Sequence, residues 1–90
     1  MITPTEAAHL REFIANLDAC ATHAAVNTCA HIAGQLWRPS DAMADAMAQI
    51  AAQHRKRLSG EIDERTCEMQ VERVIMAGTG DVADMFGSAG

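Results

Sequence analysis

An apolar pattern of helical period runs through the N-terminal third of the chain. Between Pro4 and Gly34 the chain contains no Gly or Pro, the residues that most often interrupt helices. Thr3, Pro4 and Glu6 form a helix-start signal, with a capping side chain and a proline at the first helical position. Apolar or small residues then recur every three or four positions, which predicts one continuous helix over about residues 4–37. The stripe consists of Leu10, Phe13, Ile14, Leu17, Ala21, Ala24, Thr28, Ile32 and Leu36.

Two shorter helices are expected after this one. Pro39 disfavours helical geometry at the residue before it, and Ser40 can cap the segment that follows, so a helix is predicted over about residues 41–58. Gly60 ends that segment, and a third helix is predicted over about residues 61–77.

The whole chain is interpreted as one all-α domain. No segment alternates between apolar and polar residues as a half-buried strand does. Residues 81–86 could add a short helical turn, and residues 1–3 and 87–90 are expected to fray within a single domain spanning 1–90.

The unequal helix lengths suggest a dimer. At about 1.5 Å per residue, the first helix would run roughly 50 Å and each of the others only roughly 25 Å. The three helices should pack as antiparallel neighbours, so the later two would leave half of the first uncovered. A homodimer would bury that half through Leu10, Phe13, Ile14 and Leu17. The alternative is a break in the first helix near residues 18–22, which would give a self-contained four-helix bundle.

Composition and charge exclude several classes of function. The formal net charge of −5 disfavours direct nucleic-acid binding, which needs a basic surface. Three cysteines with no secretion signal before them disfavour a disulfide framework and favour a cytoplasmic protein. No apolar run approaches the length of a membrane span, and no motif indicates a cofactor.

Four potential metal ligands, Cys20, His23, Cys29 and His31, lie within twelve positions. On a continuous helix, Cys29 would face away from Cys20, and His31 would be about 16 Å along the axis from it. Only Cys20 and His23 could then share an ion, and a structural zinc site needs four ligands. We therefore expect these residues on a solvated polar face. A helix break near residue 20, or two Cys20/His23 pairs meeting in a dimer, would reopen the possibility of a site.

No catalytic constellation is evident, so the protein is not expected to be an enzyme. Ser40 and Ser59 are explained as capping or turn residues, and neither lies in a nucleophile motif. His54 falls within the apolar stripe of the second helix, which favours a core or interface histidine with a hydrogen-bond partner.

A small regulatory protein that binds and inhibits or masks another protein is the favoured function. Phage-encoded inhibitors and bacterial antiactivators share this size and helical character. One alternative is an acidic nucleic-acid mimic that occupies the groove of a DNA- or RNA-binding protein, and another is a metal-dependent sensor using Cys20 and His23. Candidate partner-binding residues are Trp37, Arg38, Met43, Met47, Glu64, Glu68 and Glu72.

Overall fold

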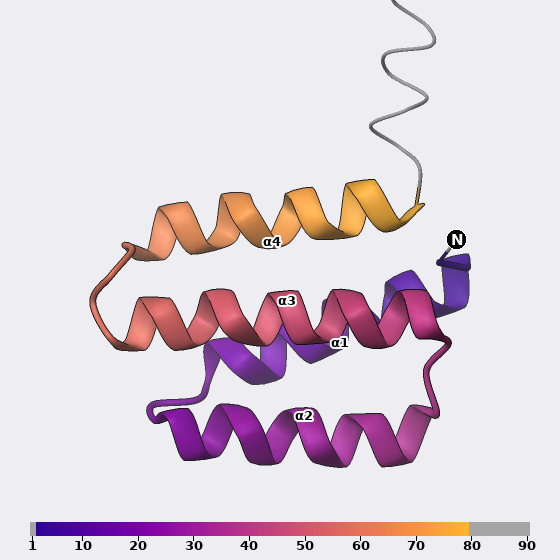
Figure 1. Cartoon of the computed structure of the whole chain (residues 1–90), viewed down its shortest axis with the longest axis horizontal. Helices are drawn as coiled ribbons and strands as arrows, with labels where there is room; N and C mark the ends of the chain where they lie inside the picture. The colour runs from indigo at the N-terminus through magenta and orange to yellow at the C-terminus, as the bar shows by residue number, and fades with distance from the viewer. Residues whose placement is uncertain (1, 80–90) are drawn as a thin grey trace, which may run out of the picture.

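The computed structural model describes residues 2–79, which form four α-helices. These are α1 (Pro4–Asp18), α2 (His23–Trp37), α3 (Asp41–Leu58) and α4 (Glu64–Thr79). The helix α3 packs against each of the other three, with α2 and α4 on its two sides and α1 crossing behind it (Figure 1). The all-α prediction is confirmed for the described residues. Met1 and the predicted turn at 81–86 lie outside them, as do residues 87–90.

The predicted continuous helix over residues 4–37 is wrong. The helix α1 ends at Asp18, and Ala19 keeps a helical backbone whose N–H donates to the carbonyl of Asn16. Thr22 is extended, with φ −136° and ψ 158°, and its side chain accepts a hydrogen bond from the N–H of Ala25 at 3.1 Å. The three-helix count is therefore corrected to four, as in the alternative with a break near residues 18–22.

Burial of the N-terminal apolar residues explains the break. Leu10, Phe13 and Leu17 are each 0% exposed, and all three pack within the chain's own core. Burying each side chain contributes about 1.5–3 kcal/mol, whereas a backbone hydrogen bond lost at the break costs about 0.5–1.5 kcal/mol net. Thr22 also compensates part of that loss by capping α2. For a single chain, the folded-back arrangement is therefore the more stable one.

The reason for expecting a dimer disappears with the continuous helix. Leu10, Phe13 and Leu17, proposed as dimer-interface residues, are intramolecular core residues, and Ile14 packs against the same core while half-buried. None of these four leaves the uncovered apolar surface that a partner copy was expected to shelter.

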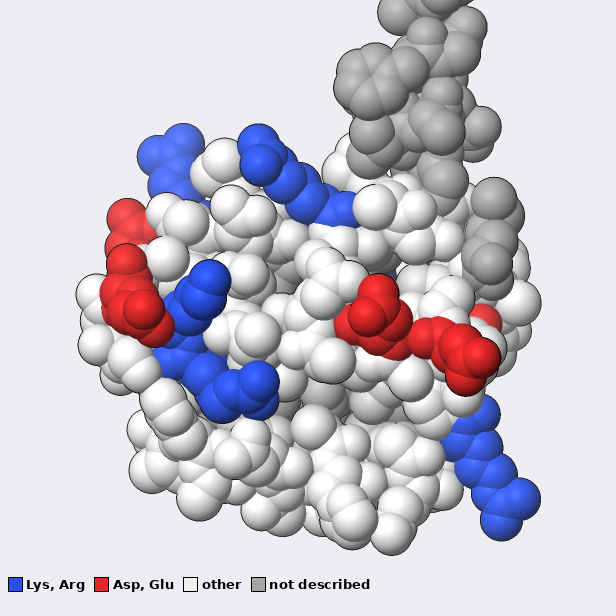
Figure 2. All heavy atoms as spheres, in the orientation of Figure 1, with Lys and Arg blue, Asp and Glu red and all other residues white. Residues whose placement is uncertain are grey.

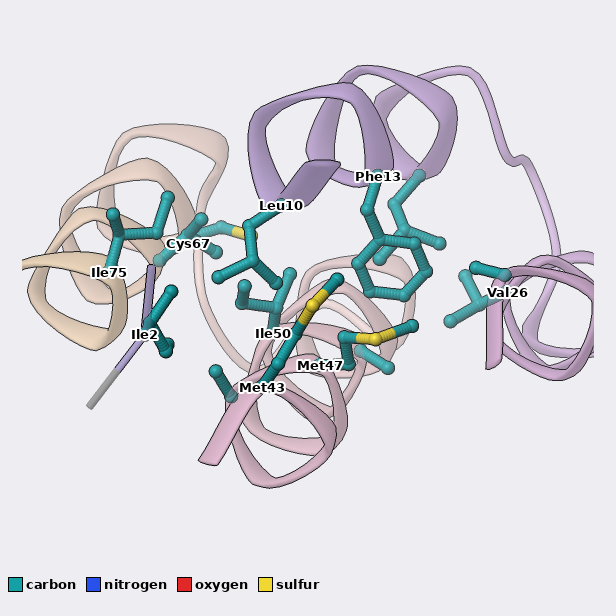
Figure 3. Close-up of a cluster of buried hydrophobic side chains, with 14 residues drawn as sticks. Ile2, Leu10, Phe13, Val26, Met43, Met47, Ile50, Cys67 and Ile75 are labelled. Atoms are coloured by element: carbon teal, nitrogen blue, oxygen red, sulfur yellow. The ribbon is translucent and has the colours of Figure 1, made fainter. Parts of the chain in front are cut away.

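The core is centred on the contact between α1 and α3 (Figure 3). Leu10 and Phe13 point from α1 towards Met43, Met47 and Ile50 of α3. Met43 and Met47 are 1% and 5% exposed, so they fill the core and are unavailable as the partner-binding surface predicted for them. Val26 of α2 and Cys67, Val71 and Ile75 of α4 complete the interior from the two sides.

The N-terminal residues Ile2 and Thr3 are held by hydrogen bonds, although they were expected to fray. The N–H of Ile2 donates to the carbonyl of Gly78 at 2.9 Å, and the Ile2 side chain is buried. Thr3 and Glu6 form the predicted capping box, with the Glu6 N–H donating to Thr3 Oγ1 at 3.1 Å. The Glu6 carboxylate also accepts hydrogen bonds from Ser40 N and Oγ, so it connects the starts of α1 and α3.

The later helix boundaries largely follow their capping residues. The helix α3 spans the predicted residues, and Ser40 caps it by accepting from the N–H of Met43. The helix α4 begins three residues later than predicted, because Asp63 accepts a hydrogen bond from the N–H of Thr66 at 2.7 Å and so serves as the cap. Gly60 has φ +80°, a left-handed conformation that glycine adopts without strain and that turns the chain from α3 towards α4.

The intramolecular burial of Leu10 makes a testable prediction. Leu10→Ala should lower the free energy of unfolding by about 2–5 kcal/mol, because it leaves a cavity in the core. Met69→Ala, at a position 52% exposed, should change it by less than about 0.5 kcal/mol. Urea unfolding followed by circular dichroism measures both values. A small effect of Leu10→Ala, with a midpoint that depends on protein concentration, would contradict an intramolecular role.

Candidate functional site

A pocket of about 290 Å³ lies between α1, the C-terminal part of α3, and α4. The buried side chains of His54 and Cys67 contribute to its lining. The remaining polar lining is charged and contains both signs: Arg11, Asp18, Arg57, Glu64, Glu68 and Glu72.

The contact of His54 with Arg57 assigns the tautomer of its neutral ring. Its Nδ1 lies 3.2 Å from the Arg57 guanidinium, which can only donate, so Nδ1 accepts and Nε2 carries the proton of the neutral ring. Nε2 is 3.8 Å from Asp18 Oδ1, which is too far for a hydrogen bond. Both His54 Nε2 and Arg57 Nε are therefore buried N–H groups without a hydrogen-bond partner among the described residues.

Burial dominates the electrostatics of this pocket. Burial lowers the pKa of His54 because a charged imidazole is poorly solvated there. The carboxylate of Asp18 raises this pKa by a smaller amount, and the positive charge of Arg57 lowers it further. Burial likewise raises the pKa of the Cys67 thiol, which Arg57 partly offsets. A neutral imidazole and a protonated thiol do not form an activated nucleophile.

The break between α1 and α2 brings two cysteines together. Cys20 Sγ lies 3.8 Å from Cys29 Sγ, within reach of an S–H···S hydrogen bond, and 3.4 Å from the carbonyl of Asn16. The expectation that Cys29 faces away from Cys20 is wrong, because it assumed one continuous helix. Burial raises the pKa of the Cys20 thiol, the contact with Cys29 raises it further, and Arg57 opposes this change.

The two histidines of this segment have hydrogen-bond partners of their own. His23 Nε2 is hydrogen-bonded to Ser59 Oγ at 2.9 Å, and His31 is hydrogen-bonded to Gln35 at 3.1 Å. Within residues 2–79, no group of three or more His, Cys, Asp or Glu side chains is placed to hold a metal ion.

The outer face of α2 is an uncharged surface with exposed apolar side chains. No residue from His23 to Trp37 is Asp, Glu, Lys or Arg. Ile32 and Leu36, one helical turn apart, are 57% and 73% exposed. Figure 2 shows that the charged side chains on this side of the molecule lie mainly over other elements and that the band occupied by α2 is uncharged.

The buried face of α2 is not the one that the sequence pattern predicts. Val26 and Ala33 are buried, and Cys29, Ala30 and Trp37 pack partly against the core. The continuous stripe had placed Ile32 and Leu36 on the buried face. The backbone leaves the helical path after Ala19, so α2 presents a different face to α3 than an unbroken helix would.

The predicted partner-binding residues are spread over several environments. Trp37 is half-buried and stacks on His9 with ring centroids 4.8 Å apart, so it covers one end of the bundle. Arg38 is exposed at the end of α2, in a left-handed conformation with φ 45°. Glu64, Glu68 and Glu72 are exposed on one face of α4.

The face carrying these three glutamates is of mixed charge. Glu72 forms an ion pair with Arg11 at 2.8 Å, and Arg57 lies in the same pocket lining. A nucleic-acid mimic needs a continuous acidic surface, and these arginines interrupt it.

Sequence reasoning missed the exposed pair Ile32 and Leu36, the Cys20–Cys29 contact and the His54–Arg57 pair. The charge-free sequence of residues 23–37 was a signal for the first of these. The Cys20–Cys29 contact depends on the turn between α1 and α2, and no local pattern indicates it. His54 and Arg57 lie three residues apart on α3, so their spacing in the sequence was a signal for that pair.

The environment of His54 predicts a pH-dependent stability. The pKa of His54 is lower in the folded chain than in the unfolded chain, so the unfolded state binds more protons as the pH falls through about 6.5. The contribution of neutral His54 to the free energy of unfolding should therefore be complete above about pH 6.5. It should be lost progressively as the pH falls towards the lowered pKa.

Urea titrations at a series of pH values, compared between the wild type and His54→Gln, measure this dependence. The variant should lose less stability on acidification, while the other three histidines, present in both proteins, cancel in the comparison. Parallel profiles would show that His54 does not contribute.

Comparison with known proteins adds no assignment: no protein-family model, no curated protein and no solved structure matches this chain. Within the described residues, none of the helices combines the length and apolar character needed to cross a bilayer.

Proposed function

We propose that this chain is a small non-enzymatic regulator that inhibits or masks a protein partner by inserting the outer face of α2 into an apolar groove. The observation that carries the proposal is the exposure of Ile32 and Leu36, at 57% and 73%, on a helix without charged residues.

The spacing of the two side chains supports this binding mode. Residues i and i+4 project from the same side of a helix, and helix-in-groove complexes use such pairs as anchors. Thr28, one turn before Ile32, is also exposed and extends the face along the helix. Transferring two largely exposed aliphatic side chains into a groove would contribute about 2–4 kcal/mol to binding.

The charge distribution supports a partner with an apolar groove. The chain carries a formal net charge of −5, yet α2 contributes none of it. A groove that encloses α2 would therefore not have to desolvate charged groups, which is costly when they are left unpaired. Arg38 lies just beyond the anchors and is exposed, so an acidic residue at the rim of the groove would complement it.

The size of this surface favours a groove over a second copy of the chain. The helix α2 has 15 residues and is about 22 Å long. Stable protein interfaces bury about 1,200–2,000 Å² in total. Two convex helices that touch along one face bury less surface than a helix enclosed by a groove. A groove would therefore come closer to the area that a stable interface needs.

The acidic-mimic alternative has weaker support, because Arg11 and Arg57 lie among the carboxylates of α4. The sensor alternative also has weaker support, since His23 Nε2 is hydrogen-bonded to Ser59 Oγ and no group of three or more metal-binding side chains forms within residues 2–79. Neither alternative uses the exposed apolar pair on α2.

Site-specific photo-crosslinking tests the proposal. A benzophenone amino acid at Thr28 of the full chain, expressed in its native cells, should crosslink to a discrete protein partner. The double substitution Ile32→Asp and Leu36→Asp should reduce that crosslink at least about tenfold, because charged side chains cannot enter an apolar groove without a large desolvation cost. Raising the salt concentration should have little effect on it.

Matched controls separate this surface from the others. A benzophenone at Met69, which is exposed on α4, should not give the same product, and Met69→Asp should leave the Thr28 crosslink unchanged. Circular dichroism should show that the double variant remains folded. Crosslinking only between copies of this chain, or a crosslink that survives the double substitution, would overturn the proposal.

A further inference from the structure

We propose that Cys20 and Cys29 form a reversible intramolecular disulfide when the protein meets a peroxide. This modification would join the end of α1 to the middle of α2. It is independent of partner binding, since it depends only on the two thiols and their surroundings.

The geometry brings the two sulfurs close to bonding distance. Cys20 Sγ and Cys29 Sγ are 3.8 Å apart, whereas a disulfide bond is about 2.05 Å long. Cys29 is held on α2, while Cys20 lies between the two helices, where its N–H donates to the carbonyl of Leu17 at 3.0 Å. A side-chain rotation at Cys20, outside the regular helices, can supply most of the missing approach.

Both thiols are also reachable from solvent. Cys20 and Cys29 are partly exposed, whereas Cys67, the third cysteine, is 1% exposed. Peroxide therefore has access to the pair and little access to Cys67. The difference in burial makes Cys67 an internal reference within the same molecule.

The surroundings of Cys20 assign the roles of the two thiols. The single S–H of Cys20 has two acceptors in reach, the Asn16 carbonyl at 3.4 Å and Cys29 Sγ at 3.8 Å, and burial raises the pKa of Cys20, so Cys20 is the thiol that stays protonated. The Cys29 thiolate attacks hydrogen peroxide, which gives a sulfenic acid at Cys29 and releases hydroxide. The Cys20 sulfur then attacks the Cys29 sulfur and forms the S–S bond, and the departing hydroxide leaves as water with the Cys20 proton.

The electron balance of this sequence is complete. Two thiols and one peroxide give one disulfide and two waters, so the protein loses two electrons and two protons. A thiol reductant such as glutathione reverses the change, because two of its thiols become one glutathione disulfide.

The disulfide would stabilise the connection between α1 and α2. It closes a loop over residues 21–28, which removes conformational freedom from the unfolded chain. For a loop of this length in a domain of this size, the thermal midpoint should rise by roughly 10 °C.

The experiment treats the reduced full chain with a small excess of hydrogen peroxide and follows the reaction by intact mass and peptide mapping. The mass should decrease by that of two hydrogen atoms, and mapping should locate the Cys20–Cys29 linkage. Cys67 should remain free to alkylate after unfolding. Glutathione should restore the reduced mass, and the thermal midpoint should be higher for the oxidised protein.

Cys20→Ser and Cys29→Ser serve as matched controls, and each should accumulate a sulfenic acid or its overoxidised products instead of the disulfide. The mapping of the wild type does not depend on whether either variant folds. Disulfides between chains, pairing that involves Cys67, or oxidation of Cys20 and Cys29 to separate acids would overturn the proposal.

Discussion

The packing of α1 against α3 is the interaction on which the rest of the structure depends. Leu10, Phe13 and Leu17 are fully buried, and the first two point at the methionines and isoleucine along the buried side of α3. A single chain can bury them only if the segment after Asp18 turns back, so the long apolar stripe is divided between two helices. The hydrophobic gain exceeds the cost of a few backbone hydrogen bonds, and the extended conformation of Thr22 follows from that balance.

The turn after Asp18 also decides which side chains of α2 reach the surface. An unbroken helix would direct Ile32 and Leu36 inwards, whereas the observed α2 buries Val26 and Ala33 and leaves that pair exposed. The same turn brings Cys20 to Cys29, which no straight helix could do. The proposed binding surface and the proposed disulfide therefore both originate in one break of the backbone.

The pocket between α1, α3 and α4 shows how the imidazole of His54 is accommodated among buried side chains. His54 is almost fully buried, and Arg57 satisfies its Nδ1 while Asp18 stays just beyond hydrogen-bond distance of Nε2. Because a charged imidazole would be poorly solvated there, burial lowers the pKa of His54. The expectation that His54 is a core histidine with a hydrogen-bond partner is thus confirmed, through a partner that lies three residues away on the same helix.

Local periodicity and capping chemistry were enough to predict the all-α class, the capping box at Thr3 and Glu6, and the full extent of α3. The break after Ala19, the phase of α2 and the contact of Cys29 with Cys20 depend instead on how the helices pack. A stripe of helical period is equally compatible with one long helix or two shorter ones, and the choice depends on where distant apolar side chains find partners.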